Sequence, residues 1–109
     1  MVEPGDVVWV RFPGAVETKL RPAVVISSKA YHATRPDVIL ALITSQVSKA
    51  NAPSDYVRID WAAAGLRIPS VLRAYFVMVA RADLPSVSGH LSAGDWQGVQ
   101  ECLRRAMGL

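Results

Sequence analysis

Cysteine, histidine and charged residues are all scarce in this chain, and each shortage excludes something. The single cysteine, Cys102, can form no disulfide within the chain, which fits a reducing cytosol. The two histidines, His32 and His90, are too few and too scattered to predict a zinc site. No apolar run approaches the roughly 18 residues of a membrane span, and no secretory signal is visible. We therefore expect a cytoplasmic protein with no bound metal, no cofactor and no membrane segment.

Several common catalytic motifs are missing as well. The sequence contains no glycine-rich phosphate loop of either common spacing and no Gly-x-Ser-x-Gly nucleophile turn. Its nine carboxylates form no cluster of the kind that a two-metal nuclease requires. Any catalysis must therefore use Arg, Ser, Thr, Tyr or His side chains, or backbone groups.

The residues that are present are mostly apolar. Hydrophobic residues make up 51% of the 109 positions and charged residues only 19%, which is more apolar than an ordinary soluble domain. A chain of this length forms one domain with a small core, so the apolar excess favours an oligomer. The net charge is +3, and nine of the twelve basic residues are arginine. This charge suits a polyanionic partner without requiring one.

The region from about residue 6 to 80 reads as short apolar strands separated by polar or Pro/Gly-containing turns. We expect polar loops over 28–37 and 44–55, and a turn of helix over 61–65. So many short strands must close on themselves, pair with another chain or leave edges exposed, and a small barrel is the economical arrangement. The expected strands are Val7–Phe12, Ala23–Ser27, Val38–Ile43, Tyr56–Ile59 and Ser70–Ala80, the last being one long strand or two short ones.

The last part of the chain predicts a helix over about residues 93–107. Ser92 stands three residues before Asp95, which is typical of a helix N-terminus, and Gly108 follows the last periodic residue. An apolar stripe at spacings of three and four is expected to pack on the barrel. Its members are Trp96, Val99, Leu103 and Met107.

Two short segments carry side chains suited to phosphate. The first is Arg21-Pro22, at the entrance to the second expected strand, where the proline restrains the backbone of the arginine before it. The second is Ile43–Gln46, which places hydroxyl and amide groups where the third expected strand ends. Either segment alone is compatible with an ordinary turn, so the pair matters more than its parts.

Three stretches of the sequence occur in a characteristic order and spacing. They are Pro4–Phe12 (PGDVVWVRF), Arg21–Ser27 (RPAVVIS) and Ile43–Ser45 (ITS). In these stretches the chain resembles the MazF/PemK family of toxin–antitoxin ribonucleases. A looser match continues through Gly65-Leu66 to Ser70–Arg73, so the resemblance covers about residues 4 to 80.

The resemblance implies a fold, an activity and partners. The fold would be mainly β, an SH3-like small barrel of the PemK/CcdB type with a C-terminal α-helix, formed by residues 1–109 as a single domain. The activity would be metal-independent cleavage of single-stranded RNA, often mRNA, at short sequences, by attack of the 2′-hydroxyl on the adjacent phosphate. The chain would act as a homodimer in the cytoplasm of a bacterium or archaeon, and a cognate antitoxin protein would bind it.

The resemblance also implies the site residues. Family members use the arginine at Arg21 and the threonine at Thr44, and part of the family uses a further arginine, at the place of Arg73. An arginine and a hydroxyl can stabilise the negative charge that gathers on the attacked phosphate. We expect RNA to contact these three side chains and four more polar or basic neighbours, which are Lys19, Ser45, Gln46 and Lys49.

The general acid and base are left open by the sequence. Some members carry an aspartate two residues after the arginine that Arg73 matches, and this chain has Tyr75 there. Arg21 is not expected to act as the base, because a guanidinium stays protonated in proteins. The candidates are His32, in the expected loop 28–37, and Glu17, in the loop before Arg21, and either could instead be an ordinary solvated side chain.

Two other classes of protein remain as alternatives. One is a non-catalytic toxin of the CcdB type, which poisons DNA gyrase by binding and typically ends in Trp-Gly-Ile, whereas this chain ends Met107-Gly108-Leu109. The other is an SH3-like binding module, because a fold does not fix a function. The combination of Arg-Pro and Thr-Ser favours the ribonuclease over both.

Overall fold

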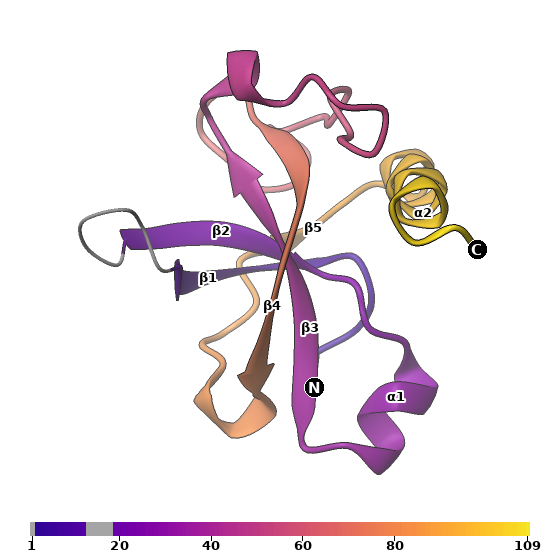
Figure 1. Cartoon of the computed structure of the whole chain (residues 1–109). Coiled ribbons are helices and arrows are strands. Elements are labelled where there is room, and N and C mark those ends of the chain that lie inside the picture. Colours follow the sequence, from indigo (N-terminus) through magenta and orange to yellow (C-terminus); the bar gives the residue numbers. More distant parts are fainter. Residues whose placement is uncertain (1, 13–18) are drawn as a thin grey trace.

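The computed structural model describes residues 2–12 and 19–109. Within these ranges the chain forms five strands, two α-helices and two short 3-10 helices (Figure 1). In chain order they are β1 (Asp6–Phe12), β2 (Lys19–Val25), α1 (Lys29–Thr34), β3 (Asp37–Thr44), η1 (Val47–Lys49), β4 (Val71–Ala80), η2 (Arg81–Asp83), β5 (Gly89–His90) and α2 (Ala93–Met107). The prediction of a mainly β fold with a C-terminal helix is confirmed.

The strands form one antiparallel sheet in the order β4-β3-β2-β1-β5. Figure 1 shows that β1 and β2 cross β3 and β4 at a steep angle, so the sheet bends strongly between β2 and β3. Neighbouring strands of an antiparallel sheet need only short connections, which suits a chain of this length.

Both faces of this sheet are covered by apolar side chains. Successive strand residues point to opposite faces, so Val24 packs in one cluster while Ala23 and Val25 pack in the other. All three are fully buried, which explains the unbroken apolar run of β2. Helix α2 covers the face of Val24, and Trp96 and Val99 contribute to that cluster.

Helix α2 begins and ends where the sequence predicts. The Asp95 N–H donates a hydrogen bond to Ser92 Oγ over 3.1 Å, and Gly108 terminates the helix with a φ of +71°. The left-handed conformation at a helix end favours glycine, because other residues have a Cβ that crowds the carbonyl. Met107, the last member of the predicted stripe, is 49% exposed and so adds little to the core.

Two segments of the region 6–80 differ from the prediction. The expected loop 28–37 contains α1, whose N-terminus is capped by Ser28 Oγ, which accepts from the Tyr31 N–H over 3.1 Å. Only His32 of this helix is buried, so its sequence shows no apolar period. The expected strand 56–59 reduces to one bridge between Tyr56 and Leu72. The expected turn of helix over 61–65 is present, because the Ala64 N–H donates to the Asp60 carbonyl over 3.1 Å and Gly65, with a φ of +82°, ends the turn.

Asp95 fixes the segment around residues 56–60 to α2. Its carboxylate accepts one hydrogen bond from the Tyr56 hydroxyl and one from the Asp60 N–H, each over 2.7 Å. Burial, together with this hydrogen bond, raises the pKa of Tyr56 to about 12. The Tyr56 ring lies directly against Gly98 of α2, where a Cβ would stand 2.2 Å from a ring carbon.

The two glycines inside α2 are therefore expected to respond oppositely to alanine. Gly98→Ala should lower the free energy of unfolding by about 1–3 kcal/mol, because the anchored Tyr56 ring must move. Gly94→Ala meets no atom within 4 Å and should raise that free energy by up to about 1 kcal/mol, because alanine is the better helix former. Urea denaturation of both variants measures the difference, and equal effects would contradict this packing.

Strand β4 contains an irregularity close to the end of β3. Ala41 pairs with Phe76, and Ile43 pairs with Leu72. One residue separates these two pairs on β3 and three residues separate them on β4, so β4 forms a bulge. The N–H of Ala74, within this bulge, donates to Asp55 Oδ1 over 3.0 Å. A buried backbone donor that leaves the ladder needs such a partner.

Among the described residues, no helix is long and apolar enough to cross a membrane.

Candidate active site

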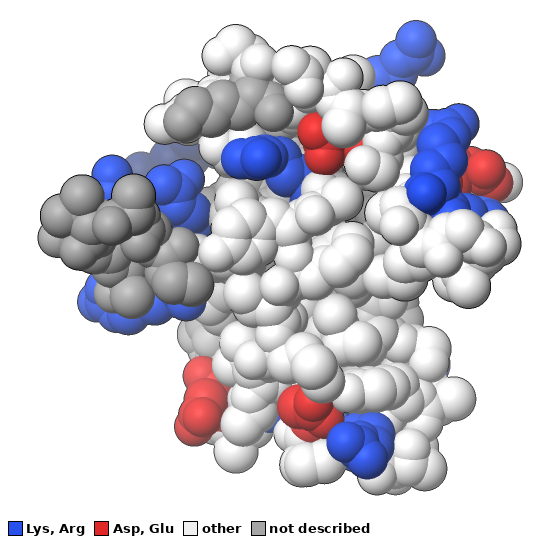
Figure 2. All heavy atoms as spheres, in the orientation of Figure 1, with Lys and Arg blue, Asp and Glu red and all other residues white. Residues whose placement is uncertain are grey.

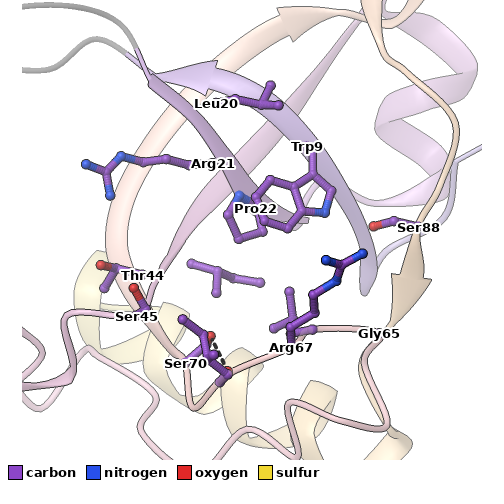
Figure 3. Close-up of a pocket in the computed structure, with 13 residues that line it drawn as sticks. Trp9, Leu20, Arg21, Pro22, Thr44, Ser45, Gly65, Arg67, Ser70 and Ser88 are labelled. Atoms are coloured by element: carbon purple, nitrogen blue, oxygen red, sulfur yellow. Dashed lines mark hydrogen bonds between the residues drawn. The ribbon is translucent and has the colours of Figure 1, made fainter.

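A cavity of about 690 Å³ lies beside the ends of β2 and β3 (Figure 3). Its walls come from strands β1 and β2, the end of β3, the segment 65–70 before β4, and Ser88 before β5. Both segments that the sequence singled out for phosphate contribute to it: Arg21-Pro22 lines it in full, and Ile43–Gln46 lines it with its first three residues. The fold thus brings together two stretches that lie about twenty residues apart in the sequence.

The strand register explains how Arg21 and Thr44 come to share this cavity. The ladder between β2 and β3 ends at the pair Ala23–Leu42, and the next residue of β2 is Pro22, which has no N–H to donate. Two positions beyond that pair, the same register sets Arg21 across from Thr44 on the same face of the sheet. Figure 3 shows their side chains on one side of the cavity.

The Thr44 hydroxyl is held by a local turn. Thr44 ends β3 and is 5% exposed, and its Oγ1 accepts a hydrogen bond from the Gln46 N–H over 3.1 Å. Within residues 2–12 and 19–109, the hydroxyl proton has no acceptor. The group is therefore oriented by one bond and still able to donate another.

Arg21 has no fixed partner at the mouth of the cavity. Its side chain is half-buried, and among the described residues its guanidinium makes no hydrogen bond or ion pair. A guanidinium offers five N–H donors in a planar fork that matches the oxygens of a phosphate. Arg21 and Thr44 together thus present unsatisfied donors to one space, which is what an anionic group would require.

Arg67 lines the same cavity, and sequence reasoning did not select it as a site residue. Figure 3 shows its guanidinium within the cavity, on the side of Trp9 and Ser88. Arg67 lies between the loosely matching Gly65-Leu66 and Ser70, and nothing in the sequence distinguishes it from a surface arginine. Arg67 lines the cavity because the segment 65–70 lies beside the sheet in the folded chain.

The other expected RNA contacts are distributed around this region. Ser45 lines the cavity, and Gln46 follows it as an exposed residue. Lys19 is exposed at the start of β2, and Arg73 is half-buried in the bulge of β4, outside the cavity wall. The backbone of Lys49 belongs to η1, but its side chain is not among those described.

Of the two acid–base candidates, the described structure contains only His32, and His32 does not line the cavity of Arg21. Glu17 lies outside the described residues. His32 belongs to a helix rather than to the expected loop, is 5% exposed and lines a different cavity. Its Nε2 lies 2.6 Å from Ser27 Oγ, and burial, followed by the charge of Arg81, lowers the pKa of its ring.

Nearly the whole sequence matches one known protein family. Residues 3–107 match the sequence pattern described as "PemK-like, MazF-like toxin of type II toxin-antitoxin system". The chain belongs to this toxin family. The family is one of endoribonucleases, and the match extends over nearly the whole chain, including α2. Within the described residues, no group of three or more His, Cys, Asp or Glu side chains could hold a metal ion.

Solved structures of related toxins share the fold of this family member. "Mycobacterium tuberculosis toxin MazF-mt6" is 21% identical, with a TM-score of 0.77 over 95% of this chain and 97% of that chain. An endoribonuclease from a Mycobacterial species, solved with its cognate antitoxin, is 16% identical, with a TM-score of 0.79 over 100% and 97%. A MazE-MazF structure from Deinococcus radiodurans is 18% identical, with a TM-score of 0.71 over 99% and 97%. No curated protein sequence matches the chain.

Proposed function

We propose that this toxin cuts single-stranded RNA, including mRNA, by attack of a ribose 2′-hydroxyl on the adjacent phosphate, without a metal. The observation that carries the proposal is the convergence of Arg21 and Thr44 on one cavity, each with a donor that no described residue satisfies. Membership of an endoribonuclease family supports the same substrate.

The proposed step needs donors at the phosphate and a route for two protons. The 2′-oxygen forms a bond to phosphorus while the bond from phosphorus to the 5′-oxygen breaks, which gives a 2′,3′-cyclic phosphate and a 5′-hydroxyl. Negative charge on the non-bridging oxygens is stabilised by the Arg21 fork and the Thr44 hydroxyl. A base takes the 2′-hydroxyl proton and an acid protonates the leaving oxygen, and Glu17 remains a candidate for either role.

RNA cleavage is expected to continue in excess EDTA. Purified protein should cut a mixed pool of single-stranded RNA under these conditions and leave 2′,3′-cyclic phosphate or 3′-phosphate with 5′-hydroxyl ends, because the proposed step uses no metal. DNA of the same sequence should stay intact, since it lacks the nucleophile. Gel analysis with end-group chemistry measures both. Intact RNA would favour the non-catalytic alternatives, a gyrase-binding toxin or an SH3-like binding module.

We also propose that the toxin is a homodimer that joins through the face around β4. In the sheet order β4 is an edge strand, and residues 74–80 carry no charge. Met78 of this strand is 58% exposed. Figure 2 shows that the centre of this face is uncharged, with the basic and acidic side chains around its margins. An exposed uncharged edge of this length is prone to pair with another chain.

Replacing Met78 by lysine is expected to break this dimer. Sedimentation of the wild type at micromolar concentration should give about twice the 11.8 kDa mass of the monomer, and Met78→Lys should give the monomer, because the new charge would be buried between two copies. Met107→Lys is the matched control, since Met107 is similarly exposed but lies on α2. A monomeric wild type, or a Met78→Lys dimer, would refute the proposed interface.

The remaining proposed partner is a cognate antitoxin. Solved relatives include toxin–antitoxin complexes, among them the Mycobacterial endoribonuclease with its cognate antitoxin. We expect an acidic segment of the antitoxin to cover the cavity that contains Arg21, because it would compete with RNA for the same positive charge. If bound antitoxin left RNA cleavage unchanged, this mode of inhibition would be wrong.

A further inference from the structure

The half of the cavity opposite Thr44 has the features of a binding site for a flat ring. Trp9 of β1 and Pro22 of β2 are directly paired across the two strands, so their side chains stand next to each other on one face. Both line the cavity, and the Trp9 side chain is 40% exposed although it is large and apolar. Figure 3 shows the indole and the proline ring side by side. Exposed aromatic rings in such places stack on unpaired bases.

The segment that carries Arg67 is held in place on both sides of that residue. Before it, Gly65 has a φ of +82°, and the N–H of the buried Leu66 donates to the Trp61 carbonyl over 2.8 Å. After it, the hydroxyl of the buried Ser70 donates to the Ile68 carbonyl over 2.9 Å. The backbone at Arg67 is thus fixed beside the cavity, and binding a ligand there costs little ordering of the chain.

The guanidinium of Arg67 is available to a ligand. Figure 3 shows it inside the cavity, toward Trp9, and in the described part of the chain it makes no hydrogen bond or ion pair. Two parallel N–H donors match two adjacent acceptors. Two of the four unpaired RNA bases present such a pair, guanine with O6 and N7 and cytosine with O2 and N3. Guanine has the larger ring system and stacks more strongly on an indole, which favours it beside Trp9.

We propose that this half of the cavity binds the base of a nucleotide next to the cleaved phosphate, and that it selects guanine. The base stacks on Trp9, and Arg67 donates to its O6 and N7. The cavity of about 690 Å³ holds both this subsite and the Arg21–Thr44 pair, so the selected base and the attacked phosphate belong to neighbouring nucleotides. This inference rests on the proposed RNA cleavage and names what fixes its sequence preference.

The first test maps cleavage sites in a long RNA and then changes single atoms of the base. We expect a guanosine beside the cut. In a short RNA, 7-deazaguanosine at that place should lower kcat/KM by about 10-fold, because one of the two acceptors is lost. Inosine should be cut as well as guanosine, since it keeps O6 and N7.

The second test combines the base change with a change of Arg67. Arg67→Ala should cut the guanosine RNA no faster than the wild type cuts the 7-deazaguanosine RNA. The variant should also cut the guanosine RNA and the 7-deazaguanosine RNA at equal rates. Arg35→Ala is the matched control, because it removes the same charge from an exposed residue at the end of α1, outside the cavity. It should keep the full preference.

Trp9 provides an independent readout of the stacking. Trp9→Phe should retain most of the affinity for RNA, whereas Trp9→Leu, which also fills space but cannot stack, should weaken binding by about 10-fold. Melting temperatures of both variants show whether the strand pair is intact. If both variants are folded and bind RNA with equal affinity, Trp9 does not stack on a base.

The outcomes separate this inference from the proposed function. If Arg67→Ala slowed every RNA equally and still distinguished 7-deazaguanosine, Arg67 would be a phosphate contact and the inference would be wrong, while the ribonuclease would stand. If no RNA were cut, the proposed function would fail. The Kd for uncleavable RNA with a 2′-O-methyl group at the cleavage site would then still decide whether guanine is selected through Arg67.

Discussion

Arg21→Ala is expected to lower kcat/KM for RNA cleavage by about 10²–10³-fold, the usual cost of losing one preorganised donor to a developing oxyanion. Its side chain lines the cavity and its guanidinium makes no hydrogen bond or ion pair with a described residue, so its loss should leave the melting temperature nearly unchanged. Single-turnover cleavage of one defined RNA, with thermal unfolding of the same samples, measures both quantities. A variant that kept wild-type activity would remove Arg21 from the site.

Two milder substitutions define what Arg21 and Thr44 each contribute. Arg21→Lys should recover only part of the activity, because an ammonium keeps the charge but loses the bidentate fork. Thr44→Val removes the hydroxyl at nearly constant shape and should cost less than Arg21→Ala. Arg35→Ala, which lowers the net charge equally at a distant surface position, should cleave normally. If it were as slow as Arg21→Ala, the effect would come from overall charge rather than from the cavity.

The sheet and the final helix could be predicted from the sequence because apolar residues stand at the positions that each element buries. The run Ala23–Val25 has no polar residue, and both sides of β2 are indeed covered. The α2 stripe and its flanking Ser92 and Gly108 likewise give a period and two ends. Apolar periodicity is the strongest local signal, and these elements depend on little else.

Elements without an apolar period could not be predicted from the sequence. Helix α1 buries only His32 and so has no stripe, while β5 has two residues, too few to show an alternation. Residues 56–59 have the β-rich composition of a strand. Their neighbour Asp60 is nevertheless tied to Asp95 on α2, a contact between residues far apart in the sequence. Such contacts override local propensity.

The candidate site likewise contains residues that the sequence identifies and residues that it does not. Thr44 ends β3 and Arg21 lies near the start of β2, and both belong to motifs that resemble a known family, so both could be named from the sequence. Arg67 is not itself one of the matching residues, and it lines the cavity because the turn at Gly65 and the hydrogen bond of Ser70 shape the segment 65–70. His32 shows the converse, because a polar residue in a polar segment proved to be buried elsewhere.

Replacement of a single 2′-hydroxyl in the substrate is expected to have the largest effect of all. In the proposed step this hydroxyl is the nucleophile, so no arrangement of protein donors can compensate for its loss. A 2′-deoxy or 2′-O-methyl sugar at the cleavage position should abolish the cut there. The same change at a neighbouring position should leave most of the rate, which controls for altered binding.

This substitution is also the most direct measurement of the central claim, that the cavity of Arg21 and Thr44 directs 2′-hydroxyl attack on RNA. The experiment compares one defined RNA with its singly modified forms in excess EDTA, with products separated by length and their ends identified. The account predicts no product at the modified position and cyclic-phosphate or 3′-phosphate ends from the unmodified RNA. Cleavage at the modified position would contradict it, because the nucleophile would then have to come from water or from the protein.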